Sequence, residues 1–421
     1  MGIKNTQLNV CQPVKILFVE ANLDGTVGGS HLLLLDLIKY LDIRRFTPSV
    51  VFFQDNSLLR EFQKISEVII FDKTNRLNIK KHLPRFMMEL SYIKYICILF
   101  QKIFNFVAHQ IPDFFKTLYF LKRQQIDIVH MNNAPYLADW VIACKILGIK
   151  CIAHLRGNWV ADPINKYFVR HYDSIIAMSN WVTDFMRAQG VPTDNFIVIY
   201  DGIDMKMVSS EKITMLGGIE TSELIGTQRT IGVVGNIIHW KGQHVLIEAM
   251  KLLKPSIPDL RCFIVGDTPS IDEDQKYFKM LKGKVEKYGL DENVIFTGFI
   301  RDIYAVVNCF DILVHTSTEP EPFGRVILEG MILEKPVIAT AHGGPLEIIE
   351  NGVSGFLVRP NNPDELAENI RHLLSNPELM NIVGKEAKKR VTELFDMEQT
   401  AKKIEALYQQ LLDKSHQNTF E

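Results

Sequence analysis

The sequence predicts an α/β protein made of two doubly wound, parallel-sheet domains in tandem. Short runs of β-branched and other apolar residues alternate with longer amphipathic segments along the chain. The short runs are apolar throughout, as in strands that helices cover on both faces. This rhythm lapses near the middle of the chain and then starts again. Strand–helix alternation of this kind indicates right-handed crossovers and a mainly parallel sheet in each half.

The composition is that of a globular protein with more than one domain. The 421 residues correspond to two or three domains of ~150 residues each. The 47 basic and 49 acidic residues give a net charge of −2, which excludes a general electrostatic attraction for nucleic acid. None of the six cysteines forms a Cys-x-x-Cys pair, and the N-terminus lacks the apolar core of a signal peptide. We therefore expect a reducing, cytoplasmic compartment.

The first domain is expected to span residues 1–204. Its strands are predicted at 14–19, 49–53, 68–71, 126–131, 150–154, 174–178 and 196–200, and its helices at 31–41, 136–147, 163–171 and 180–188. Residues 205–228 have no clear period and are interpreted as a linker. The second domain is expected at 229–395, with strands at 230–234, 262–265, 294–296, 312–315, 337–339 and 355–358. Its helices are predicted at 243–253, 274–288, 302–307, 325–333 and 363–375, and residues 396–421 form a terminal helix and tail.

An insert at residues 73–124 of the first domain is unusually basic and apolar. It contains ten lysines and arginines against two acids, a net charge of +8. Its longest uncharged run, 103–112, is far shorter than the ~20 residues that span a bilayer. One interpretation is a segment that lies on an anionic membrane with its basic groups among the headgroups. The alternative is a long core helix whose lysines reach out to water.

The most informative stretch follows the strand predicted at 312–315. It contains two acids, Glu321 and Glu329, on either side of Gly324. The carboxyl end of a parallel strand is where doubly wound sheets bind ligands, and the N-terminus of the next helix favours a phosphate. Carboxylates there are expected to face hydroxyl groups rather than phosphates. A nucleotide sugar, with a diphosphate between two hydroxyl-rich groups, has the required shape.

These residues resemble the Glu-x7-Glu motif of the retaining glycosyltransferases of family 4, which have the GT-B fold. Further segments resemble the family in the same order: Gly25-Thr-Val-Gly-Gly-Ser30, Tyr200-Asp-Gly-Ile-Asp204, Val234-Gly-Asn-Ile-Ile-His-Trp-Lys-Gly242 and Ala341-His-Gly-Gly-Pro-Leu-Glu347. The resemblance implies two Rossmann-like domains that face a central cleft. The first would bind the acceptor and the second the nucleotide sugar.

The resemblance also implies roles for individual residues. Glu329 corresponds to the carboxylate that holds the ribose hydroxyls, and Glu321 to the one near the donor sugar, assisted by the backbone of Phe323 and Gly324. Lys241 corresponds to the lysine on the diphosphate. Its charge would stabilise the leaving group. The loop of Gly28 and Gly29 would touch the phosphate and the acceptor, and His154 would lie close to the donor sugar. Gly235 belongs to the loop after the first strand of the second domain, and the backbone of Gly298 and Phe299 would meet the base. His315 and Asp267 are interpreted as structural.

One position departs from the family pattern. Asn236 stands where the family usually has an arginine after the glycine, so a bidentate phosphate clamp is missing. We expect Arg325, or otherwise Arg156, to take over this work.

The function implied is transfer of a hexosyl unit, with retention of configuration, from a UDP- or GDP-sugar to a lipid-linked or surface-polysaccharide acceptor such as lipopolysaccharide or capsule. The departing diphosphate would accept the acceptor's proton, and no metal or other cofactor is expected. The enzyme would be cytoplasmic and peripheral on the inner face of the membrane. Two alternatives remain: a nucleotide-sugar epimerase of the same fold, and a non-catalytic nucleotide-sugar-binding homologue.

Overall fold

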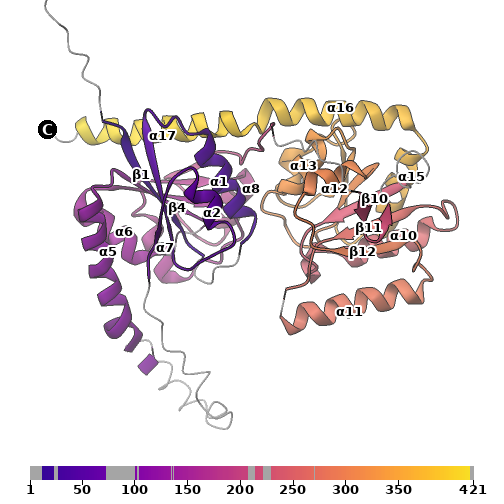
Figure 1. Ribbon diagram of the computed structural model, residues 1–421, viewed down its shortest axis with the longest axis horizontal. Helices are drawn as coiled ribbons and strands as arrows, with labels where there is room; N and C mark the ends of the chain where they lie inside the picture. The colour runs from indigo at the N-terminus through magenta and orange to yellow at the C-terminus, as the bar shows by residue number, and fades with distance from the viewer. Residues whose placement is uncertain are drawn as a thin grey trace, which may run out of the picture. The chain divides into compact units, whose positions relative to one another are not determined.

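The computed structural model describes residues 12–22, 27–72, 100–101, 104–133, 135, 137–206, 214–220, 229–269 and 271–417. The chain divides into two compact units (Figure 1). Unit 1 consists of Met1–Ala177, Phe185–Ile197 and Ala401–Glu421, and unit 2 of Met178–Asp184 and Val198–Thr400. The insert predicted at 73–124 lies outside the described residues from 73 to 99.

Unit 1 contains a seven-stranded parallel sheet in the order β3-β2-β1-β4-β5-β6-β7. The strands are β1 (Val14–Glu20), β2 (Phe46–Phe52), β3 (Glu67–Ile70), β4 (Ile128–Asn132), β5 (Lys150–Leu155), β6 (Ser174–Ala177) and β7 (Phe196–Val198). Strand β1 pairs with the central strand β4 so that Glu20 lies opposite Asn132. The last five residues of β1 and all five of β4 are buried, which explains the apolar run Ile16–Val19 in β1.

The helices of unit 1 connect and flank this sheet. They are α1 (Gly29–Tyr40), α2 (Leu59–Gln63), α5 (Ile111–Gln124), α6 (Ala138–Leu147) and α7 (Pro163–Val169), with the π-helical turn η2 (Phe106–Gln110) leading directly into α5. Helix α8 (Asn180–Ala188) begins in unit 2 and passes into unit 1 at Phe185. The last helix, α17 (Met397–Gln417), lies beside β1 in Figure 1. Its Tyr408 hydroxyl is 2.6 Å from His130 Nδ1 on β4. Helix α17 therefore contributes to the core of unit 1.

Unit 2 contains a six-stranded parallel sheet in the order β12-β11-β10-β13-β14-β15. The strands are β10 (Thr230–Val234), β11 (Arg261–Val265), β12 (Val294–Gly298), β13 (Ile312–His315), β14 (Val337–Thr340) and β15 (Phe356–Val358). A small antiparallel hairpin, β8 (Met215–Leu216) and β9 (Ile219–Glu220), lies within the stretch predicted as a linker.

Helices cover both faces of the sheet in unit 2. The helices are η3 (His239–Lys241), α10 (Gln243–Leu253), α11 (Asp272–Lys287), α12 (Ile303–Asn308), α13 (Arg325–Ile332), α14 (Pro345–Ile348), α15 (Pro363–Leu374) and α16 (Pro377–Leu394). One core joins α10, α11 and α15 to alternate strand residues such as Ile231 and Val233. Residues of opposite parity face α13, where a side chain at Gly330 would collide with Leu313. This alternation follows from the two-residue period of a strand.

The predicted fold class is confirmed: both units are doubly wound parallel sheets. The predicted strands and helices match the observed ones to within a few residues. The elements without a predicted counterpart are α2, α5, α14, α16, η2, η3 and the hairpin of β8 and β9. The 18-residue helix α16 was missed because it buries only a narrow stripe, which ends at Val391, in an otherwise charged sequence. The predicted domain boundary at 204 and the observed units also differ, because unit 2 takes over at Val198 and Ala401–Glu421 returns to unit 1.

Candidate functional site

The candidate donor site of unit 2 forms where the order of strands reverses. The chain leaves β10 toward β11 on one side, whereas β13 is the neighbour of β10 on the other side. The loops after β10 and β13 therefore meet at the carboxyl edge of the sheet, the place where such sheets bind ligands. These loops carry Lys241 and Glu321, which are 80 residues apart in sequence. The Lys241 Nζ atom lies 2.5 Å from Glu321 Oε2.

Glu321 is the centre of a buried polar cluster. Its Oε2 atom also lies 3.1 Å from His315 Nε2 and 3.1 Å from the Ser317 hydroxyl. Burial by itself would raise the pKa of the Glu321 carboxyl, but the Lys241 ammonium and the His315 hydrogen bond outweigh it. Together they hold that pKa well below its usual range. The carboxyl is therefore an ionised acceptor, suited to holding hydroxyl groups.

Glycines allow the backbone segments of this cluster to approach each other closely. Gly242 follows Lys241 with φ +70°, and a Cβ atom there would lie 2.0 Å from the Thr316 carbonyl oxygen. Gly343 has φ +85°, and a Cβ there would lie 2.2 Å from the Glu321 carbonyl oxygen. Larger residues at these positions would push the loops apart. The two glycines thus set the positions of Lys241 and Glu321.

Glu329 lies within helix α13, whereas Glu321 lies in the loop before it. The helix begins at Arg325, with Gly324 at its N-cap (φ +106°), so Glu321 precedes it by four residues. Arg325 Nε donates to Glu329 Oε1 over 3.0 Å. Phe323 is buried. Arg325 was expected to replace the arginine missing at position 236. Its guanidinium instead bonds Glu329, the carboxylate predicted to hold the ribose.

The remaining predicted donor residues lie at the ends of β10 and β12. Gly235 follows β10 with φ +146° and donates to the Val265 carbonyl, and Asn236 next to it is exposed. Gly298 ends β12 with φ +73°, and a Cβ added there would meet nothing within 4 Å. The Phe299 ring beside it is 72% exposed. In the sheet, β11 lies between β10 and β12, so the ends of β10 and β12 are one strand apart.

A second polar cluster, in unit 1, lies at the carboxyl ends of β1, β4 and β5. Asn132 Nδ2 donates to Glu20 over 2.5 Å, and Arg156 Nε donates to Asn132 Oδ1 over 2.8 Å. Arg156 Nη2 is 3.3 Å from His154 Nδ1. Since arginine can only donate, the neutral His154 ring carries its proton on Nε2. Burial, then the charge of Arg156, hold the pKa of His154 well below its usual range.

Gly28 and Gly29 lie beside this cluster at the start of α1. Gly28 is the N-cap of the helix, and its N–H donates to His31 Nδ1 over 3.3 Å. A Cβ added to either glycine would meet nothing within 4 Å. Gly28 and Gly29 therefore have free space beside their Cα atoms, near the carboxyl end of β1.

Glu20 makes the stability of the chain depend on pH. Burial raises the pKa of its carboxyl from 4.5 to about 7, against the hydrogen bond from Asn132. The folded state then binds more protons than the unfolded state between these values, so the free energy of unfolding falls as the pH rises from about 4.5 to about 7. The total fall is about 3 kcal/mol. Urea unfolding across this range should show it in the wild type and not in Glu20→Gln.

Glu67→Gln is the matched control, because Glu67 is exposed on β3 of the same sheet. It should keep the wild-type slope of stability against pH. Equal slopes for Glu20→Gln and the wild type would contradict a raised pKa at Glu20.

Sequence reasoning missed two residues of the Glu321 cluster, His315 and Ser317, and the contacts that Glu347 makes outside it. His315 was interpreted as structural, yet it bonds Glu321; its place at the last residue of β13 was the available signal. Ser317 lies 3.1 Å from both of them. Glu347, of the matched Gly-Gly segment, accepts from the backbone N–H groups of Asn180 and Trp181 over 2.9 and 2.8 Å, and so caps α8 within unit 2.

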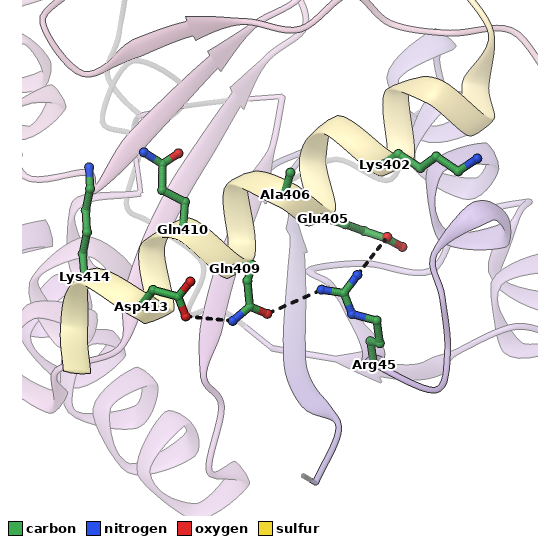
Figure 2. A pocket seen from close by; sticks show the side chains of 8 residues that line it. All are labelled: Arg45, Lys402, Glu405, Ala406, Gln409, Gln410, Asp413 and Lys414. Atoms are coloured by element: carbon green, nitrogen blue, oxygen red, sulfur yellow. Dashed lines mark hydrogen bonds and ion pairs between the residues drawn. The ribbon is translucent and has the colours of Figure 1, made fainter. Parts of the chain in front are cut away.

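A surface hollow on α17 contains none of the predicted site residues. It measures about 630 Å³ and is lined mainly by polar side chains of α17 together with Arg45 (Figure 2). Arg45 lies 3.9 Å from Glu405 and 3.5 Å from Gln409. These contacts fasten α17 to the start of β2, so we interpret the hollow as part of the helix packing.

The fold and the two clusters define a GT-B protein, and comparisons with known proteins give its family. Residues 27–206 match the model for "Glycosyltransferase Family 4", and residues 219–390 match that for "Glycosyl transferases group 1". The putative glycosyltransferase EpsD of Bacillus subtilis is 34% identical over 68% of this chain and 71% of its own length. The chain therefore belongs to the group 1 glycosyltransferases.

A second relative and a solved structure are also similar to this chain. The capsular polysaccharide biosynthesis glycosyltransferase CapM of Staphylococcus aureus is 27% identical over 60% of this chain and 72% of its own. Among solved structures, Anabaena Alr3699/HepE in complex with UDP superposes with a TM-score of 0.75 at 25% identity, covering 94% of this chain and 100% of that one. The same Anabaena protein is also known in complex with UDP-glucose.

Proposed function

We propose that the protein is a retaining hexosyltransferase that uses a UDP- or GDP-linked sugar as donor. The observation that carries the proposal is the ionised Glu321 carboxylate, held by Lys241 and His315 at the switch point of the sheet in unit 2. A plain helix cap would need neither a half-buried ammonium nor a buried histidine on one carboxylate oxygen. The UDP and UDP-glucose complexes of the Anabaena relative favour a uridine donor.

The residues would divide the work along the donor. Glu329 would accept from the ribose hydroxyls, with the backbone at Gly298 and Phe299 near the base. Lys241 has three N–H donors, so it can bond Glu321 and still face the diphosphate. Its charge would stabilise the leaving group, and the departing diphosphate would take the proton of the acceptor hydroxyl. Binding and orientation of both substrates would supply the rest of the rate.

We propose a lipid-linked or surface-polysaccharide acceptor, bound through unit 1, and work at the inner face of the membrane. The basic insert at 73–124 supports the lipid, and the capsular relative supports the polysaccharide. Within the described residues, no three His, Cys, Asp or Glu side chains are grouped to hold a metal ion. Metal-independent transfer remains a prediction, tested by comparing rates with EDTA and with added Mg²⁺.

Incubation of the purified protein with UDP-glucose, other UDP-hexoses and GDP-mannose tests the activity itself. We expect slow release of nucleotide diphosphate with one donor, faster release with a lipid-linked glycan, and a product with the anomeric configuration of the donor. Inversion of configuration would exclude the retaining mechanism. Interconversion of donor sugars without acceptor would instead indicate an epimerase.

Calorimetric titration with UDP tests the assignment of Glu329. Glu329→Gln should weaken UDP binding about 10- to 100-fold, because hydrogen bonds to a charged acceptor contribute about 1.5–3 kcal/mol. Glu368→Gln, an exposed change on α15, is the control and should bind like the wild type. Equal affinity of all three proteins would place the ribose elsewhere.

A further inference from the structure

The helical residues 104–124 of unit 1, which include η2 and α5, expose a row of apolar side chains. They recur three or four residues apart and are 38 to 68% exposed: Phe104, Val107, Ile111, Phe115 and Tyr119. We call this row the aromatic stripe. Figure 1 shows α5 at the margin of unit 1, next to α6, against which it packs. A row of this length on one helix is far from the scattered single apolar residues of an ordinary surface.

The opposite side of the same helix is polar and buried. Asn105, Asp113 and Thr117 are 8, 2 and 0% exposed, and they share the inward side with Leu121. A helix on the surface of a globular protein normally shows the reverse arrangement, with apolar residues inward. The sequence left open that this segment is a core helix whose lysines reach out to water. Such a helix would bury its aromatic residues, whereas those of the aromatic stripe are exposed. Among the described residues, the stripe faces outward.

The charges around the aromatic stripe have one sign. Lys122 and Arg123 are exposed on α5, whereas Lys116 bonds the Asp72 carbonyl, and the single acid between residues 104 and 124, Asp113, is buried. Basic groups beside an apolar helix face are the arrangement that binds anionic lipid headgroups. A water-soluble protein partner would need no such uniform charge. None of the described helices combines the length and the apolar character needed to cross a bilayer.

We propose that the aromatic stripe binds the interface of an anionic phospholipid bilayer, with α5 lying in the plane of the headgroups. The phenyl rings would enter the boundary of the acyl chains, while the Tyr119 hydroxyl and the basic side chains meet the headgroups. The biological purpose of this contact rests on the proposed function, in which the acceptor is linked to a lipid. Binding to lipid can be measured without any sugar donor.

Flotation of the full chain with vesicles tests this proposal. The wild type should float with vesicles that contain phosphatidylglycerol and much less with pure phosphatidylcholine vesicles. Phe115→Ser/Tyr119→Ser should lower the bound fraction at least about tenfold, because two large apolar groups leave the interface. Lys122→Glu/Arg123→Glu should abolish the preference for the anionic vesicles. Ile43→Ser/Val160→Ser removes equally exposed apolar side chains elsewhere in unit 1 and should float like the wild type.

Two further readouts separate the possible outcomes. Light scattering should show the same mass for the wild type and Phe115→Ser/Tyr119→Ser; a wild-type dimer that this variant splits would assign the stripe to a second copy and overturn the proposal. Equal flotation of all variants, or none with anionic vesicles, would also overturn it. Slow UDP-sugar hydrolysis should be unchanged in Phe115→Ser/Tyr119→Ser, so a failure of donor turnover in the wild type would count against the proposed function alone.

Discussion

Replacement of Glu321 by glutamine is expected to lower kcat for glycosyl transfer by about three orders of magnitude. The glutamine amide keeps the size of the side chain but removes the charge that Lys241 and His315 surround. It then holds the sugar hydroxyls less well and leaves the Lys241 ammonium without its partner. The measurement is the initial rate of UDP release with saturating donor and acceptor.

Glu319→Gln is the matched control for this loss. Glu319 lies two residues earlier in the same loop and is exposed, so its replacement should leave kcat within about twofold of the wild type. Thermal unfolding of both variants would show whether the loop is still folded. If Glu321→Gln retained wild-type kcat, the carboxylate would have no part in transfer and the assignment of the donor site would be wrong.

The pH dependence of transfer gives a further check on Glu321. Because the pKa of its carboxyl is held well below its usual range, the group stays ionised from neutral to mildly acidic pH. Any fall in kcat through that range must therefore come from another group. A kcat profile that Glu321→Gln alone flattened near its ordinary pKa would contradict the effect of Lys241 and His315.

Replacement of Lys241 by methionine should reduce kcat about 10²- to 10³-fold, since a positioned charge on the developing diphosphate is lost. It should also raise the pKa of the Glu321 carboxyl, because the ammonium is the largest influence that lowers it. The variant should be less stable by about 1–3 kcal/mol, since a largely buried carboxylate loses its cation. Initial rates measure the loss of kcat, and urea unfolding measures the loss of stability separately.

Two comparisons test the reason for this loss. Lys276→Met changes an exposed lysine of α11 and should alter neither quantity. Lys241→Arg keeps the charge and should recover part of the rate, because the cation matters more than its exact donor geometry in this role. A Lys241→Met variant that lost stability but kept kcat would make Lys241 a structural partner of Glu321 and not a catalytic residue.

The strands could be predicted from the sequence because a strand buried on both faces is apolar along its whole length. Thr230–Val234 and Ile312–His315 were predicted to the residue for this reason. The charged helix α16 was not predicted, because a helix that buries only a narrow stripe has few apolar residues and therefore a weak apolar periodicity. The spacing of Glu321 and Glu329 could be read from the sequence. Only the structure shows that the helix begins at Arg325, so that Glu329 lies on the helix and Glu321 lies in the loop before it.

The sequence by itself determined the α/β class, the two sheets and the motifs that resemble the family, because each of these depends on residues close together along the chain. Only the tertiary structure decided which groups surround Glu321, since Lys241 reaches it through the adjacency of β10 and β13, and His315 through the last residue of a strand. It also decided which way the helix of the basic insert faces. Local periodicity shows that a helix has two sides, but the packing against the rest of the chain sets which side meets water.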